Sequence, residues 1–488
     1  MRALTPVLAL ALAAAAPAGA DDEAPLSPQT EECLGCHADY HPGLVGDWRA
    51  SRHSRVTPAQ GMAQPEISRR VSSQVTGPGR DYAVGCFECH GANPGTHADE
   101  FDHYDVRIHI VVTPRDCATC HQEEARQYDG SKKAHAVGNL ELNPVYHGLV
   151  QTLTSVRRVG EGGALEAVAG PGSAPSVACF ACHGTHVEVA GFREVDVGDD
   201  VVRIPELTNW PNQGVGRLNP DGSRGACTAC HPRHSFSIET ARKPYTCAQC
   251  HLEPDVPAWD VYRESKHGNI ALSNGAEWDW THVPWRVGQD FRAPTCATCH
   301  NALIATPGNA AIVPRTHDFG DRLWVRIFGL VYSHPQPVSG ATHTLVNGDG
   351  LPLPTTFGGQ LAERGLIGLK EQGRRQRQMV SLCRSCHSTA WSEGFFTRLD
   401  STIAETDRMT AAATQLLSRG WELGLADPAN PFDEPLEHKW MRQWLLYANS
   451  TRYGAAMSGP DYAAFKNGWF SMTTNLVEMQ AAVQGGKR

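Results

Sequence analysis

The chain has 488 residues, with 52 acidic and 43 basic side chains and a formal net charge of −9 at pH 7. A chain of this length can bury the cores of two or three ordinary domains. Its acidic balance, without a basic patch, argues against nucleic acid and anionic lipid as partners, because both are bound through clustered lysine and arginine.

The N-terminus is typical of an export signal. Arg2 precedes an apolar run over residues 4–16, and a small-x-small cleavage site follows at residues 18–20. We expect residues 1–20 to be a signal peptide and the mature protein to be periplasmic. The alternative is a membrane anchor that stays attached, although the run is short for a membrane span. We expect no membrane span in the mature chain.

Eight Cys-x-x-Cys-His motifs use all 16 cysteines of the chain. Disulfides or zinc sites give no reason for a His after every second cysteine. In c-type cytochromes the two thiols of such a motif bond to a haem and the His ligates its iron. The sequence therefore predicts eight c-type haems. The cysteines and proximal histidines are Cys33, Cys36 and His37; Cys86, Cys89 and His90; Cys117, Cys120 and His121; Cys179, Cys182 and His183; Cys227, Cys230 and His231; Cys247, Cys250 and His251; Cys296, Cys299 and His300; and Cys383, Cys386 and His387.

Eight large apolar macrocycles can form the core of residues 21–387, so that this octahaem-binding domain needs only short helices and loops. The 32 prolines and 47 glycines fit such a chain. Residues 155–175 and 187–225 predict loops with a little strand around the fourth haem. The fifth and sixth motifs follow each other closely, which predicts two haems within electron-tunnelling contact.

Histidines outside the motifs are candidates for the distal side of the irons. His53, His135 and His267 each end a segment that begins with an aromatic residue, at Trp48, Tyr128 and Tyr262 respectively. Such a segment can press a ring on one haem and offer an imidazole to an iron. The alternative is a solvated helix face with surface histidines. The other distal candidates are His103, His234 and His317, with a seventh open between His147 and His186, and with His97 and His109 as substitutes for His103.

Residues 388–488 differ in composition and contain no cysteine. Apolar residues recur every three or four positions around Leu417 and Trp444, with prolines between the two groups. We predict two or three long amphipathic helices that form a C-terminal domain for subunit packing. The predicted fold is therefore a mainly α multihaem cytochrome c, wrapped around eight haems, with a C-terminal bundle of long helices.

In these motifs and connecting segments the chain resembles the octahaem hydroxylamine oxidoreductase family, which includes hydrazine dehydrogenase. The likeness covers nearly the whole mature chain. No Cys-x-x-Cys-Lys motif occurs, which argues against the octahaem nitrite and tetrathionate reductases that have a lysine-ligated haem. The segments that carry the resemblance are residues 42–53, 86–93, 210–223, 241–244, 264–268, 316–318 and 460–462.

The resemblance implies that the fourth haem, at His183, is catalytic and open on its distal side. In oxidising members a Tyr of a neighbouring subunit is bonded to this porphyrin, which gives a P460-type haem in a homotrimer. Tyr462 matches that residue, with Tyr453 as the fallback, and the alternative is an interfacial Tyr without the bond. Asp255 matches an Asp above the open haem, whereas Val256 stands where the family has a His.

The resemblance therefore implies oxidation of hydroxylamine to nitric oxide or nitrite at the fourth haem. His183, Asp255 and Tyr462 would serve this reaction, and electrons would leave through seven bis-His haems to a cytochrome c partner. Because Val256 cannot accept a proton as His does, a reductase of nitrite, nitric oxide or hydroxylamine stays open. Further alternatives are hydrazine oxidation and a non-catalytic electron-transfer cytochrome.

Overall fold

The computed structural model describes residues 24–163, 165–168, 174–198 and 200–485. The predicted signal peptide lies outside these residues. Helices predominate and the strands are short, in agreement with the predicted mainly α fold. Among the described helices, none combines the length and the apolar character that crossing a membrane requires.

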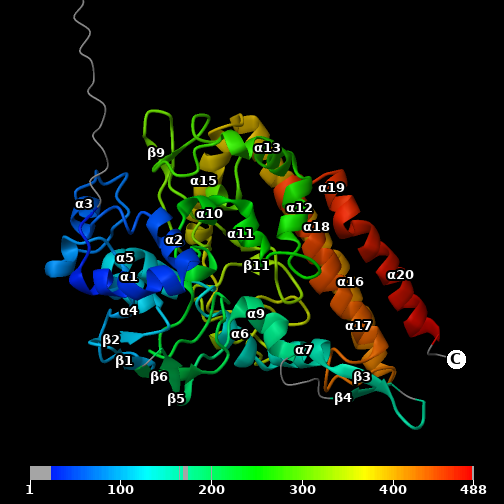
Figure 1. Cartoon of the computed structure of the whole chain (residues 1–488). Coiled ribbons are helices and arrows are strands. Elements are labelled where there is room, and N and C mark those ends of the chain that lie inside the picture. Colours follow the sequence, from blue (N-terminus) through cyan, green and yellow to red (C-terminus); the bar gives the residue numbers. More distant parts are fainter. Residues whose placement is uncertain (1–23, 164, 169–173, 199, 486–488) are drawn as a thin grey trace, which may run out of the picture.

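The motif-bearing part of the chain consists of short helices joined by loops (Figure 1). A helical turn suits the Cys-x-x-Cys-His motif, because positions i, i+3 and i+4 lie on one helix face. Proline at the first turn and a polar cap begin several of these helices, as Thr113 does for α5. They are α1 (Pro28–Tyr40), α2 (Pro42–Ala50), α3 (Pro58–Met62), α4 (Cys86–His90), α5 (Pro114–Asp129), α6 (Ala136–Glu141), α7 (Pro144–Thr154), α8 (Ala174–Val177), α9 (Cys179–His183), α10 (Ile238–Arg242), α11 (Pro244–Ala248), α12 (Ala258–Glu264), α13 (Lys266–Asn274) and α14 (Cys296–His300), with 3-10 turns η1 (Pro78–Arg80), η2 (Cys227–Ala229), η3 (Gly275–Glu277) and η4 (Thr342–Thr344).

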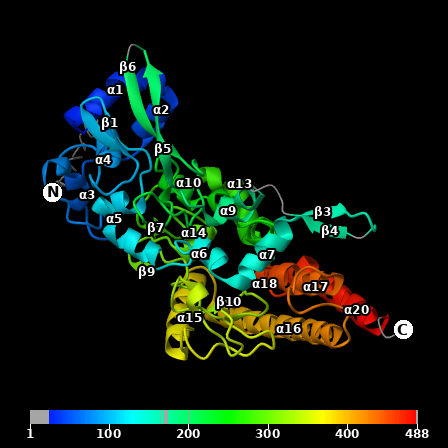
Figure 2. The ribbon, with the colours of Figure 1, turned by 90° about the horizontal axis from the view of Figure 1, so that it is seen from below.

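The strands form small, separate sheets. Most are antiparallel hairpins, and only β7 and β8 pair in parallel among the described strands. Figure 2 shows the β5–β6 hairpin beside β1 and the β3–β4 hairpin projecting near α7. The strands are β1 (Glu100–His103), β2 (Val106–His109), β3 (Val156–Val159), β4 (Leu165–Val168), β5 (Val189–Val197), β6 (Asp200–Leu207), β7 (Trp285–Arg286), β8 (Ile304–Ala305), β9 (Ala311–Val313), β10 (Val325–Arg326) and β11 (His334–Pro335).

The C-terminal helices lie together along one side of the molecule (Figure 1). Trp440 and Trp444 are fully buried between them, and this apolar burial is their main source of stability. Gly459 ends the run that starts at Pro435, because its positive φ of 145° breaks the helix. The elements are α15 (Leu369–Arg384), α16 (Thr389–Glu422), α17 (Pro435–Met441), α18 (Asn449–Tyr453), α19 (Tyr462–Ala464) and α20 (Phe470–Gly485), with π-helical turns η5 (Arg442–Ala448), η6 (Gly454–Ser458) and η7 (Phe465–Trp469).

Candidate haem sites and active site

A connected cavity of 3560 Å³ runs through the motif-bearing part of the molecule. Ordinary ligand pockets measure about 300–1000 Å³, so this space suits several large groups rather than one. Its wall contains cysteines from the second to the eighth motif, together with aromatic side chains such as Phe236, Trp259 and Trp391. No disulfide joins the described cysteines. Thiols, imidazoles and aromatic rings around one large space are the groups that covalently bound haems require.

Thiols of different motifs lie close to each other and join the motifs into three groups: the first with the second, the third with the fifth, and the fourth with the sixth and seventh. The sixth motif occupies a central place, because its two thiols meet the fourth motif on one side and the seventh on the other. A cofactor held by the sixth motif would therefore lie next to the cofactors of the fourth and seventh motifs. The neighbouring thiol pairs are Cys33 with Cys86, Cys117 with Cys227, Cys182 with Cys250 and Cys247 with Cys296.

Two motif histidines are held in an orientation that leaves Nε2 available for ligation. His90 donates from Nδ1 to the carbonyl oxygen of His109 at 2.8 Å. His183 donates from Nδ1 to the carbonyl oxygen of Ala136 at 3.3 Å. An imidazole held in this way keeps its other nitrogen free for a metal. The residues present therefore fit the predicted c-type haems.

Several predicted distal histidines lie opposite a motif histidine. Metal–imidazole bonds are about 2 Å long, so two rings that share one ion have centres about 6 Å apart. Five ring pairs show this spacing, and the charge of His231 acts on His317 in a further pair. The ring pairs are His103 with His37 at 6.1 Å, His53 with His121 at 6.3 Å, His234 with His90 at 6.5 Å, His109 with His90 at 6.1 Å and His267 with His387 at 6.0 Å.

The remaining distal candidates have other surroundings. His135 precedes α6 and donates to the backbone of Asp129. His147 pairs with Gln151, and His186 lies 2.8 Å from Glu141. Both His147 and His186 are exposed. Ligation by any of these histidines stays a prediction.

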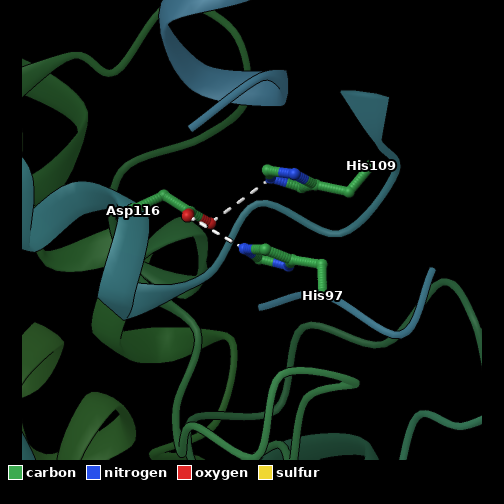
Figure 3. A group of neighbouring side chains, drawn as sticks. All are labelled: His97, His109 and Asp116. Carbon is green, nitrogen blue, oxygen red and sulfur yellow. Dashed lines mark hydrogen bonds and ion pairs between the residues drawn. The ribbon is translucent and has the colours of Figure 1, made fainter. Parts of the chain in front are cut away.

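His97 and His109 form a buried cluster with Asp116, shown in Figure 3. The two rings stack in parallel with centres 3.6 Å apart, and His97 Nε2 lies 3.0 Å from the Asp116 carboxylate. Burial lowers the pKa of His97, but hydrogen bonds to Asp116 and Asp99 outweigh it and raise the pKa to about 9. His97 is therefore protonated at neutral pH. The resulting ion pair supports His109, whose carbonyl oxygen orients His90.

The fourth motif has charged and phenolic groups around it. Burial is the largest influence on His183 and lowers its pKa, and the charges of Lys133, Asp255 and Arg326 also act on it. Asp255 and Val256 line the cavity beside this motif, on the loop after the sixth motif. The structure thus brings together two of the predicted catalytic residues, His183 and Asp255.

Of the two candidate tyrosines, Tyr453 faces the cavity and Tyr462 is exposed on the outside of the chain. Tyr453 lines the cavity, where burial raises its pKa to about 12 and the charges of Arg326 and Asp255 also act on it. The Tyr462 side chain is 75% exposed, on α19 at the outer edge of the C-terminal helices (Figure 1). Residues 459–461, directly before Tyr462, still line the cavity.

Arg326 is a site residue that the sequence analysis missed. It lies on β10, opposite His334 of β11, and its charge acts on both His183 and Tyr453. His334 is buried and donates from Nδ1 to the carbonyl oxygen of Pro335 at 2.7 Å. The segment Trp324-Val325-Arg326-Ile327 has no motif, so only tertiary packing reveals the role of Arg326.

Comparisons with known proteins agree with this arrangement. The family described as "Seven times multi-haem cytochrome CxxCH" matches residues 221–308. A solved structure titled "Hypothetical multiheme protein" shares 41% identity and a TM-score of 0.89, over 95% of this chain and 96% of its own.

Two similar proteins come from Kuenenia stuttgartiensis. A curated "Probable nitrite reductase-hydroxylamine oxidoreductase fusion protein" is 23% identical over 406 residues, which are 82% of this chain. The match spans only 38% of that protein's length. A solved reducing HAO-like protein complex shares 20% identity and a TM-score of 0.61, over 94% of this chain and 85% of its own. At that identity the likeness shows the fold alone.

Proposed function

We propose that this chain, which belongs to the hydroxylamine oxidoreductase-like multihaem cytochromes, is a periplasmic octahaem oxidoreductase that oxidises hydroxylamine at its fourth motif. The observation that carries the proposal is the set of groups around His183. The other motif histidines described above have an imidazole opposite them in five cases. Around His183 the structure instead has Asp255, Arg326 and Tyr453, which suit a small polar substrate.

A haem at the fourth motif would supply an iron for the substrate nitrogen and a macrocycle that accepts its electrons. Asp255 would accept protons from the N–H and O–H groups of the substrate. Oxidation of hydroxylamine to nitric oxide releases three protons and three electrons, so a proton acceptor beside the substrate is needed at each step. Val256 has no titratable group, so Asp255, whose charge acts on His183, is the residue that we assign as general base on this loop.

The positive charge of Arg326 can stabilise negative charge on the substrate. Each deprotonation that precedes the loss of an electron would leave the substrate more negative, and a fixed guanidinium beside it would stabilise that charge. Tyr453, whose raised pKa keeps its phenol protonated at neutral pH, can donate a hydrogen bond to the same ligand. Together these groups bind a small nitrogen compound and move its protons.

The contacts between motif thiols support the proposed exit of electrons. The fourth motif touches the sixth, and the sixth touches the seventh. Further haems would store several electrons while a one-electron carrier removes them singly. A basic cytochrome c suits the net charge of −9.

We also propose that Tyr462 bonds to the fourth haem of a neighbouring subunit in a homotrimer. Tyr462 is exposed within its own chain, as are Phe465 and Phe470 on the same outer side. Exposed aromatic side chains in a row favour burial in a subunit interface. A Tyr contributed by the neighbour would complete the P460-type site.

A reductase of nitrite, nitric oxide or hydroxylamine at the same haem is the second candidate. Val256 favours it, because the site lacks the neutral base that would accept protons during oxidation, whereas reduction can draw its protons from water. Rapid anaerobic mixing separates the two directions. In an oxidase, hydroxylamine reduces the ferric haems, whereas in a reductase nitrite or hydroxylamine reoxidises the pre-reduced haems.

The same measurement tests whether the chain is an enzyme. Haem absorbance would be followed after adding hydroxylamine to the oxidised octahaem protein. Fast reduction of the low-spin haems supports the proposed oxidation. If no haem changes its spin state or its redox state with any of these compounds, the chain is an electron-transfer cytochrome and the proposal is wrong.

A further inference from the structure

Three segments of the chain share one local structure. Each has a buried aromatic residue, then a buried Ser three positions later, and the Ser N–H donates to the aromatic residue's carbonyl oxygen at 2.9 Å. In the second and the third segment, the Ser hydroxyl also donates a hydrogen bond of 2.6 Å to the carbonyl oxygen of the aromatic residue. The aromatic–Ser pairs are Trp48 with Ser51, Tyr128 with Ser131, and Tyr262 with Ser265.

The aromatic residues also have equivalent contacts. Trp48 Nε1 donates to the carbonyl oxygen of Val84, two positions before the second motif. The Tyr262 hydroxyl donates to the carbonyl oxygen of Pro294, two positions before the seventh motif. The Tyr128 hydroxyl likewise donates to a backbone carbonyl, that of Val215. The three segments are therefore structural repeats, and their residues can be compared position by position.

The fifth residue after the aromatic is the one that meets a motif histidine. In the first and third segments it is a histidine, His53 opposite His121 at 6.3 Å and His267 opposite His387 at 6.0 Å. In the second segment the same position is occupied by Lys133, not by His135. Lys133 Nζ lies 2.9 Å from Nε2 of His251, in the sixth motif.

We propose that Lys133 is the distal ligand of the haem at the sixth motif, which would then have His/Lys rather than bis-His coordination. Nε2 of His251 is the atom that would bind the iron, and Lys133 Nζ is the side-chain nitrogen that lies against it. An unprotonated lysine amine carries one lone pair for a metal, and its four-carbon stem can extend or fold to reach the axial position.

The neighbourhood of Lys133 supports this role. Its ammonium nitrogen lies 5.6 Å from the centre of the Phe319 ring, and within the described residues it forms no ion pair. The adjacent Lys132 points to a different partner, because its Nζ donates to the side-chain oxygen of Gln336 at 2.7 Å. Lys132 corresponds to Arg52 and Lys266 in the other repeats, so a basic residue precedes the ligand position each time.

An amine at this position would set the sixth haem apart from its neighbours. The thiols of the sixth motif lie close to those of the fourth and the seventh, so its haem would be the first acceptor of electrons from the fourth. The identity of an axial ligand is a main determinant of haem potential. Lys133 would thus tune the first transfer away from the substrate site.

The test is the ferric spin state of the purified octahaem protein, by low-temperature paramagnetic resonance without substrate. Lys133→Ala should convert one low-spin haem per chain to high spin. Lys133→His should keep that haem low-spin but replace the signal of an amine-ligated haem with one of bis-imidazole type. Lys132→Ala is the matched control and should leave the spectrum unchanged.

Two results would overturn the proposal. One is a Lys133→Ala protein with eight haems and the same high-spin content as the original. The other is loss of a low-spin haem in His135→Ala but not in Lys133→Ala, which would make His135 the ligand. If Lys133→Ala does not accumulate with eight haems, the comparison of the original protein with Lys133→His decides alone. The inference requires a haem at the sixth motif. Because the test uses no substrate, its outcome does not depend on whether the protein oxidises hydroxylamine.

Discussion

The thiol of Cys182 in the fourth motif lies against that of Cys250 in the sixth, although the two residues are 68 positions apart along the chain. Cofactors bonded to these two sulfurs would lie side by side. Electrons that enter at the proposed substrate site would therefore pass first to the sixth haem. This contact makes the sixth motif the first link of the proposed electron path.

This first link predicts the behaviour of His251→Gly. Without its proximal ligand, the sixth haem should pass electrons poorly, so reduction of the other low-spin haems by hydroxylamine should slow. The spectral change at the fourth haem on binding hydroxylamine should persist. His37→Gly, in the first motif, is the control and should slow electron transfer far less. Equal slowing in both variants, measured by stopped-flow absorbance, would contradict the predicted path.

The ring pairs predict ligand roles that can be tested one at a time. His53→Ala should add one high-spin ferric haem per chain, because His53 faces His121 at the spacing of two imidazoles on one iron. The exposed His147 provides the control, and His147→Ala should not change the spin count. Paramagnetic resonance on the oxidised protein measures both. An unchanged spectrum for His53→Ala would remove His53 from the set of distal ligands.

Asp255→Asn should slow hydroxylamine oxidation by about 10²–10⁴-fold, the usual contribution of a general base. Binding should weaken much less, because an amide still accepts a hydrogen bond. Glu253→Gln, two positions earlier on the same exposed loop, is the matched control and should keep most of the activity. Initial rates with an excess of an artificial electron acceptor measure the effect. A rate within a few fold of the original protein would exclude Asp255 as the base.

Tyr462→Phe tests the proposed bond between subunits. On a denaturing gel stained for haem, the original protein should run as a trimer-sized band, and the Tyr462→Phe protein as a monomer. Tyr453→Phe is the control and should keep the trimer-sized band, since Tyr453 lies inside its own chain's cavity. A monomer band from the original protein would mean that Tyr462 forms no covalent bond and would favour the reductase.

The buried ion pair of His97 predicts a change of stability with pH. Its pKa in the folded protein is about 9, above the usual value of about 6.5 in an unfolded chain. Its stabilising contribution is therefore complete below about pH 6.5 and is lost as the pH rises through about 9. His97→Asn should remove this part of the pH dependence, whereas His147→Asn should not.

Thermal unfolding followed by circular dichroism between pH 6 and 10 measures this effect. The original protein should lose stability across the alkaline half of the range. The His97→Asn protein should be less stable at pH 6 and should change less toward pH 10. Parallel curves for the two proteins would show that the protonated form of His97 does not stabilise the fold.

The sequence by itself determined the cofactor chemistry that we expect and the mainly helical class. Cys-x-x-Cys-His is a local motif, since one helical turn holds all of its reactive groups. Apolar spacing likewise predicts helices around Leu417 and Trp444 without knowledge of their partners. The structure places both residues in one core cluster between α16, α17 and α20.

Only the tertiary structure decided which groups face one another across the cavity. Distal candidates such as His234 come from anywhere in the chain, and spacing in sequence does not constrain them. The contact of Lys133 with His251, the approach of Arg326 to His183 and the exposure of Tyr462 all depend on packing between distant segments. Long-range contacts are set by the burial of the whole fold, and no local pattern encodes them.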